Sequence, residues 1–233
     1  MHRDVVTRAR PSRRLLSRRG RVVALALILV TVVVGGALAL RYEGTSSPGR
    51  IDQEITTALE GWPAWFRGMV DLGDPGPLLA LILVVAVGAV LARRGVLFAL
   101  VAPVVAVLIS HGIAKPLVGR TIGEGLAYPS THMTGVGAVL TVIMVLIAAQ
   151  RSWPRAVRLA VLPVLLAIAL VYAGTLSALA FHYPTDTIGG LCLAVAVVLA
   201  CAFASDAVAG RFTRVSTELE GEPHDQEPGR AGR

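Results

Sequence analysis

Long uncharged apolar stretches alternate with short polar segments along most of this chain. Six stretches, at 22–40, 77–92, 96–113, 133–149, 156–174 and 187–204, hold almost no charged residue. The first would form a helix of about 28 Å at 1.5 Å per residue, which is enough to cross the apolar part of a bilayer. The pattern therefore predicts an all-α integral membrane protein with six transmembrane helices, in one domain over residues 22–204.

The polar segments at the two ends of the chain have a different character. Residues 1–21 form an arginine-rich arm and residues 205–233 a tail of mixed charge. Both segments lack the apolar residues that a packed core needs, so we expect both to be disordered. Residues 1–39 could alternatively be a signal peptide that is cleaved after Ala37-Leu38-Ala39, although the apolar run is long for one.

The longest internal polar connection, at 41–76, contains apolar residues at helical spacing, two Trp and one Phe among them. This pattern fits a helix that lies at the membrane interface, and it fits equally a helix that covers the end of the bundle as a lid. The breaker cluster Gly73-Asp74-Pro75-Gly76-Pro77 is predicted to end the element.

The arginines indicate how the spans are oriented. They gather at alternate ends of the spans, in the N-terminal arm, at Arg93 and Arg94, at Arg151 and Arg155, and at Arg211 and Arg214. Short loops rich in Lys and Arg stay on the cytoplasmic side, so both termini are predicted to be cytoplasmic. The connections 41–76, 114–132 and 175–186 then face the extracytoplasmic side of a multi-pass protein of the cell membrane.

The overall charge does not indicate nucleic-acid binding. The formal net charge is +7 and 55% of the residues are hydrophobic. Because the basic residues flank apolar runs, they serve as a topology signal, and no nucleic-acid partner is predicted.

Two polar islands, 115–132 and 181–186, both fall on the predicted extracytoplasmic side. Pro129-Ser130 opens the fourth span and Pro184-Thr185 opens the sixth. Each helix start offers free backbone N–H groups and the positive end of a helix dipole. Together with Lys115 and Arg120, these helix starts predict a site for a phosphate dianion.

Two histidines and one aspartate supply the candidate chemistry. His182 and Asp186 are four residues apart and share a helix face, so the carboxylate can orient the imidazole as a nucleophile. His132, at the other helix start, is the candidate proton donor. The alternatives are a hydrogen-bonded polar plug and a metal site with these three ligands. Lys115 and Arg120 would repel a cation, so no metal and no other cofactor is predicted.

These residues resemble the motifs of the type-2 phosphatidic-acid phosphatase superfamily, the membrane branch of the acid phosphatase and vanadium haloperoxidase fold. Lys115 matches the first motif, Pro129-Ser130 with His132 the second, and His182 with Asp186 the third. The resemblance covers about residues 22–204. It implies a six-span helical bundle in which His182 attacks phosphorus, Asp186 orients it and His132 protonates the leaving group, without a metal.

The sequence departs from the family pattern at both motif arginines. Ile122-Gly123 stands where the first motif has Arg-Pro, and Thr175-Leu176 stands where the third has Ser-Arg. Arg120 lies two residues before the expected arginine and would serve if the loop is shifted. Lys115, Arg120, Ser130 and Thr131 are therefore the predicted phosphate-binding residues, with Thr131 where glycine is usual.

We accordingly predict a metal-independent phosphatase for lipid phosphates or diphosphates, working through a phosphohistidine. Its substrates would be polyprenyl phosphates or diphosphates, or phosphoglycerolipids, entering from the surrounding membrane lipids. One alternative is a catalytically weak or inactive relative that binds or transports lipids, which the missing arginines favour. Another is a phosphotransferase that uses an acceptor other than water.

Overall fold

A computed structural model describes residues 14–93 and 95–220, and nearly all regular structure in it is helical. The helices are α1 (Arg18–Arg41), α2 (Arg50–Ala58), α3 (Pro75–Leu91), α4 (Val96–Ile109), α5 (Lys115–Val118), α6 (Thr131–Ala149), α7 (Arg155–Ala178) and α8 (Pro184–Glu220). A 3₁₀ segment, η1 (Ala64–Gly73), precedes α3, and a π-helical turn, η2 (Ser110–Ala114), joins α4 to α5. Two short strands, β1 (Thr121–Ile122) and β2 (Gly125–Leu126), form a hairpin.

The helices match the six predicted spans, which confirms the all-α membrane bundle. In the described part of the chain, five helical segments are long and apolar enough to cross a bilayer: Arg18–Arg41, Val96–Val118, Thr131–Ala149, Arg155–Ala178 and Pro184–Arg211. A sixth is obtained if η1 and α3 count as one span, although they meet at a bend of 74°. The sequence Asp74-Pro75-Gly76-Pro77 lies at this bend, as the breaker pattern predicts.

Helix α6 lies at the centre of the bundle, and small residues put it there. Of the 18 most apolar consecutive residues of α6, 67% are buried inside the bundle. The corresponding fraction in α1 is 6%, so most side chains of α1 lie on the outer surface of the bundle. A methyl group at Gly190 of α8 would lie 2.6 Å from the Ser130 carbonyl oxygen, and one at Gly137 would lie 3.3 Å from Leu191. Because these glycines have no side chain, α6 and α8 approach backbone to backbone.

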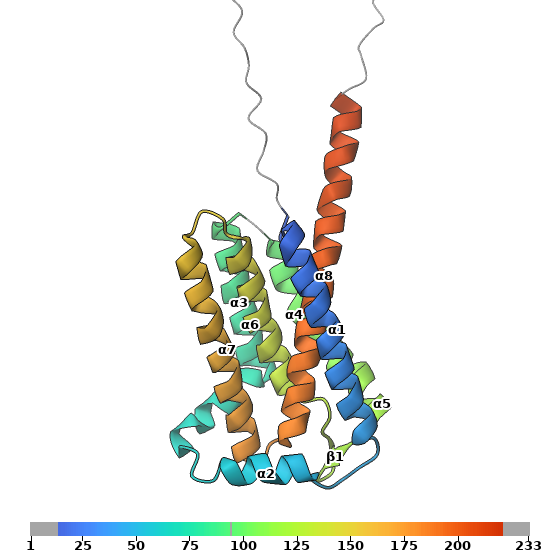
Figure 1. The fold of residues 1–233 in the computed structure, drawn as a ribbon, viewed down its shortest axis with the longest axis vertical. Coiled ribbons are helices and arrows are strands. Elements are labelled where there is room, and N and C mark those ends of the chain that lie inside the picture. The colour runs from blue at the N-terminus through green and yellow to red at the C-terminus, as the bar shows by residue number, and fades with distance from the viewer. Residues whose placement is uncertain (1–13, 94, 221–233) are drawn as a thin grey trace, which may run out of the picture.

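Both polar islands lie at one end of the bundle. Figure 1 shows α2, α5 and β1 at this end, while the α3–α4 and α6–α7 connections lie at the opposite end, beyond which α8 projects. The alternation of spans that was inferred from the arginines thus brings 115–132 and 181–186 together.

The connection 41–76 forms two elements where a single helix was expected. Helix α2 crosses the end of the bundle beside the start of α8 (Figure 1). Segment η1 packs Val70 into a core cluster with Met133, Tyr172 and Leu176, which covers the bundle as the lid alternative described. Trp65 remains 76% exposed.

The two terminal segments are described only in part. Residues 1–13 of the basic arm and residues 221–233 of the tail lie outside the described residues. Helix α1 begins at Arg18, with the Ser17 hydroxyl as its N-cap, and so includes the end of the arm. Helix α8 continues past Ala204, the predicted end of the last span, as far as Glu220.

Candidate active site

The N-termini of α6 and α8 meet at the end of the bundle that holds both polar islands. Ser130 is the N-cap of α6, and its hydroxyl accepts a hydrogen bond of 3.2 Å from the backbone N–H of Met133. The backbone N–H of Ser130 donates to the carbonyl oxygen of Asp186, at 3.0 Å. The second and third motifs are therefore joined through their backbones.

This junction brings the two predicted catalytic histidines together. The rings of His132 and His182 lie with their centroids 6.0 Å apart. The His182 side chain is only 9% exposed, whereas that of His132 is 28% exposed. A phosphoryl group between these rings would have one imidazole on each side, which is the arrangement that attack and leaving-group protonation require.

Asp186 lies beside His182, in the first turn of α8. Its Oδ2 accepts a hydrogen bond of 3.2 Å from the Tyr183 N–H, in the manner of a capping box, and lies 3.9 Å from His182 Nδ1. Within the described chain His182 Nδ1 has no hydrogen-bond partner. Closing the gap by about 1 Å would make one.

The surroundings of His182 favour its neutral form. Burial lowers the pKa of this imidazole, and the positive charge of Lys115 acts in the same direction, while the nearby Asp186 opposes the shift. A neutral imidazole has the free electron pair that a nucleophile needs.

Lys115, the first residue of α5 and directly after the π-helical turn η2, is buried near His182. Its Nζ donates hydrogen bonds to the carbonyl oxygens of Leu126 and Ala127. An ammonium group has three N–H donors, so one remains for a ligand. Thr131 Oγ1 lies 3.3 Å from the hydroxyl of Ser110, while Ser130, used as a cap, is fully buried.

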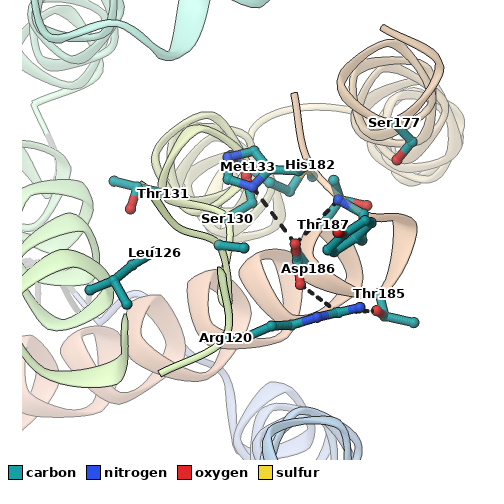
Figure 2. Close-up of polar contacts among 12 residues, drawn as sticks. Arg120, Leu126, Ser130, Thr131, Met133, Ser177, His182, Thr185, Asp186 and Thr187 are labelled. Carbon is teal, nitrogen blue, oxygen red and sulfur yellow. Dashed lines mark hydrogen bonds and ion pairs between the residues drawn. The ribbon is translucent and has the colours of Figure 1, made fainter. Parts of the chain in front are cut away.

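Arg120 is held between two carboxylates and two tyrosine rings. Its guanidinium is fully buried, with Nη2 2.6 Å from Asp52 and Nη1 2.7 Å from Asp186 (Figure 2 shows the second pair). The rings of Tyr42 and Tyr183 stack on it, with centroids 4.0 and 4.4 Å from Cζ. A buried charge needs partners inside the protein, and these two carboxylates supply them. The guanidinium is thus engaged by two carboxylates, and its predicted role in binding phosphate stays a prediction.

Asp52 of α2 was not among the predicted site residues, yet it fastens the start of α8. Its Oδ1 accepts hydrogen bonds from the backbone N–H and the hydroxyl of Thr185, at 2.9 and 2.7 Å. Burial opposes the ionisation of Asp52, but the bonds from Thr185 and Arg120 outweigh it and keep its pKa below the usual value. No sequence signal singles out Asp52, because it is one polar residue among several in a predicted amphipathic helix and its partners are distant in sequence.

The two positions where the family arginines are missing serve the fold. Ile122 pairs with Gly125 in the β hairpin. Leu176, at the other arginine position, is fully buried in the core cluster with Val70, Met133 and Tyr172. The hydroxyl of the preceding Thr175 donates to the Val171 carbonyl oxygen at 2.9 Å. Neither position therefore supplies a charge.

A second carboxylate that the sequence reasoning missed lies beside His132. The Asp74 Oδ1 atom is 3.2 Å from Nε2 of His132. Within residues 14–93 and 95–220, no group of three His, Cys, Asp or Glu side chains is placed to hold a metal ion.

Comparisons with known proteins support the fold. No protein-family model matches the sequence, and no curated protein matches it significantly. Among solved structures, this chain is similar to a transmembrane PAP2-type phosphatidylglycerolphosphate phosphatase from Bacillus subtilis, with a TM-score of 0.58 and 19% identity. The match covers 87% of this chain and 98% of that one. The fold implied by the motif resemblance is thereby confirmed.

Proposed function

We propose that this chain is a diverged type-2 phosphatidic-acid phosphatase, which hydrolyses a lipid phosphate or diphosphate at the membrane. The observation that carries the proposal is the meeting of His132, His182 and Asp186 at the joined starts of α6 and α8. His132 lies 50 positions before His182 and 54 before Asp186, and nothing in ordinary helix packing requires ionisable groups to gather at this point.

The reaction has two steps. In the first, the neutral His182 attacks phosphorus with Nε2, the bond from phosphorus to the lipid oxygen breaks, and His132 gives its proton to the departing oxygen. In the second, water attacks the phosphohistidine, His132 takes a proton from that water, and inorganic phosphate leaves. With a diphosphate, the leaving group of the first step is the lipid monophosphate.

One cation and several hydrogen-bond donors around the junction hold the phosphate. Lys115 has one N–H free, Thr131 offers a partly exposed hydroxyl, and the first turn of α6 contributes backbone N–H groups. Arg120 acts at one remove, because its guanidinium holds Asp186 in place beside His182. The site therefore works with fewer phosphate-binding cations than its relatives' motifs would supply, which predicts weak ground-state binding.

The substrate is a membrane lipid, and the site faces the extracytoplasmic side. The exposed apolar surface of the spans supports this proposal, because lipid beside it would bring the phosphate of a phosphoglycerolipid or a polyprenyl chain to the site from the leaflet. Phosphatidylglycerol phosphate, the substrate named for the Bacillus subtilis protein, belongs to the first class. The side of the membrane follows from the arginine distribution.

Phosphate release by the full-length protein in detergent tests this function. The panel would contain phosphatidylglycerol phosphate, phosphatidic acid, and a polyprenyl phosphate and diphosphate, each with chelator and no added metal. We expect release from at least one lipid, with loss of more than about a hundredfold in His182→Ala and no change in His111→Ala, an exposed histidine of η2.

The intermediate and the acceptor need their own measurement. A substrate labelled in the phosphate should leave acid-labile, base-stable label on the wild-type protein and none on His182→Ala. Label that appears on an added alcohol in place of inorganic phosphate would identify a phosphotransferase. Lipid binding without label or release in a folded protein would instead identify a binding protein and refute the proposal.

A further inference from the structure

The junction of η1 and α3 places a second carboxylate against the second histidine. The Oδ1 atom of Asp74 lies 3.2 Å from Nε2 of His132, within reach of a hydrogen bond. The candidate site thus holds two histidine–carboxylate pairs, and the partner of His132 comes from a separate connection of the chain.

Local sequence explains why this carboxylate is available. Asp74 is the N-cap residue of α3, where an aspartate normally accepts hydrogen bonds from the N–H groups of the first turn. Here Pro75 and Pro77 occupy the first and third helical positions and have no N–H. The side chain of Asp74 makes no capping bond, and it is directed to His132 instead.

Close packing fixes the approach of this junction to the histidine. A methyl group added at Gly73 would collide with the His132 ring and with the hydroxyl of Tyr172. The Tyr172 hydroxyl also lies 3.3 Å from the carbonyl oxygen of Val70, in η1. Because Gly73 lets the backbone lie directly on the ring, the next residue delivers its carboxylate to the ring edge.

We propose that Asp74 is the positioning residue of the general acid. Its carboxylate accepts a hydrogen bond from the Nε2–H of His132 and stabilises the imidazolium. The Nδ1–H is then left to protonate the departing lipid oxygen. This inference rests on the proposed function. When the Nδ1 proton moves to the leaving oxygen, His132 becomes neutral with its remaining proton on Nε2, toward Asp74.

The other titratable groups around His132 do not stabilise its positively charged form. His182 faces its ring from the α7–α8 connection, with Lys115 and Asp186 behind it. Tyr172 approaches from α7. Of these groups, Lys115 disfavours a second positive charge and Asp186 is already paired with Arg120. Asp74 is therefore the carboxylate placed to support the charged form of His132.

The first test is the pH dependence of turnover. In Asp74→Asn, which keeps the side-chain size, we expect kcat on a lipid phosphate to fall at least about tenfold, and the alkaline limb of the profile to move to lower pH. Asp74→Glu should recover part of the loss. Asp71→Asn, an exposed carboxylate in the same segment, is the matched control and should behave as wild type.

The second test uses the leaving group. An aryl phosphate such as p-nitrophenyl phosphate needs little protonation of its departing oxygen, so Asp74→Asn should slow it far less than it slows a lipid phosphate. Equal losses on both substrates with an unmoved pH profile would show a merely structural residue. A faster Asp74→Asn enzyme would show that the carboxylate repels phosphate, and either result would overturn the proposal.

A readout without turnover separates this inference from the proposed function. In ¹⁵N-histidine NMR spectra of the full-length protein in detergent, the His132 resonance should titrate at lower pH in Asp74→Asn than in wild type or Asp71→Asn. The same titration in all three proteins would refute the pairing even if the enzyme is active. The expected shift in a protein that releases no phosphate would keep the pairing and discard the phosphatase.

Discussion

Removing the charge of Arg120 should disable the site by loosening the start of α8. In Arg120→Met, two fully buried carboxylates, Asp52 and Asp186, lose their shared cation. Breaking a buried ion pair by removing one partner costs about 3–5 kcal/mol, because the remaining charge stays buried and unpaired. In a chain of this size that corresponds to a fall of roughly 10 °C in the unfolding midpoint.

The assay combines unfolding with kinetics, on the full-length protein in detergent. The midpoint would be followed by tryptophan fluorescence and compared with Arg50→Met, whose ion pair with Glu54 is exposed and should contribute little. Arg120→Lys keeps a charge but not the forked geometry that reaches both carboxylates. If Arg120 positions Asp186, this variant should lower kcat about tenfold or more, with KM nearly unchanged.

The opposite kinetic pattern would refute this account of Arg120. A variant that unfolds at the wild-type temperature, and that shows a raised KM with an unchanged kcat, would mean that Arg120 contacts the phosphate after all. The predicted shift of the loop would then accompany substrate binding.

Three further outcomes follow from the structure. The pKa of Asp52 in the folded protein lies below its ordinary value of 3.8, so its ionised form stabilises the fold fully above about pH 4. This stabilisation is lost as the pH falls through the folded pKa. Asp52→Asn should therefore flatten the acid side of a plot of unfolding midpoint against pH. Because burial lowers the pKa of His182, kcat should stay high as the pH falls through 6.5 and drop only at more acid pH, which a pH–rate profile checks. In Gly190→Ala the new methyl group would lie 2.6 Å from a carbonyl oxygen, which should destabilise the protein by about 1–3 kcal/mol. In Gly36→Ala the methyl group meets nothing within 4 Å and should leave the stability unchanged, and unfolding curves of the two variants would check this.

Much of the framework could be predicted because its signals are local. Uncharged runs of sufficient length give the spans, and alternating arginines bring 115–132 and 181–186 to one end. The spacing of His182 and Asp186 places both at one helix start, and Ser130 marks the start of α6. Each of these inferences needs only neighbouring residues and the periodicity of a helix.

The rest depended on contacts between residues far apart in sequence. Asp52 binds Arg120 and Thr185 across 68 and 133 positions, and Asp74 reaches His132 across 58. In the sequence, Asp52 looked like one polar residue of an amphipathic helix, and Asp74 like part of a breaker. The distance of Arg120 from a motif position suggests a phosphate-binding role, but a count of residues cannot show in which direction a loop points a side chain.

The continuous last helix has a consequence for how the protein is made. Asp186 lies in the first turn of α8 and His182 just before it, so both leave the ribosome after Arg120 and Asp52. Until α8 is inserted, Arg120 lacks one of its two carboxylates and His132 lacks the His182 ring that faces it. A chain that lacks α8 therefore carries an incompletely neutralised arginine, so insertion of α8 and neutralisation of this charge are coupled steps of folding.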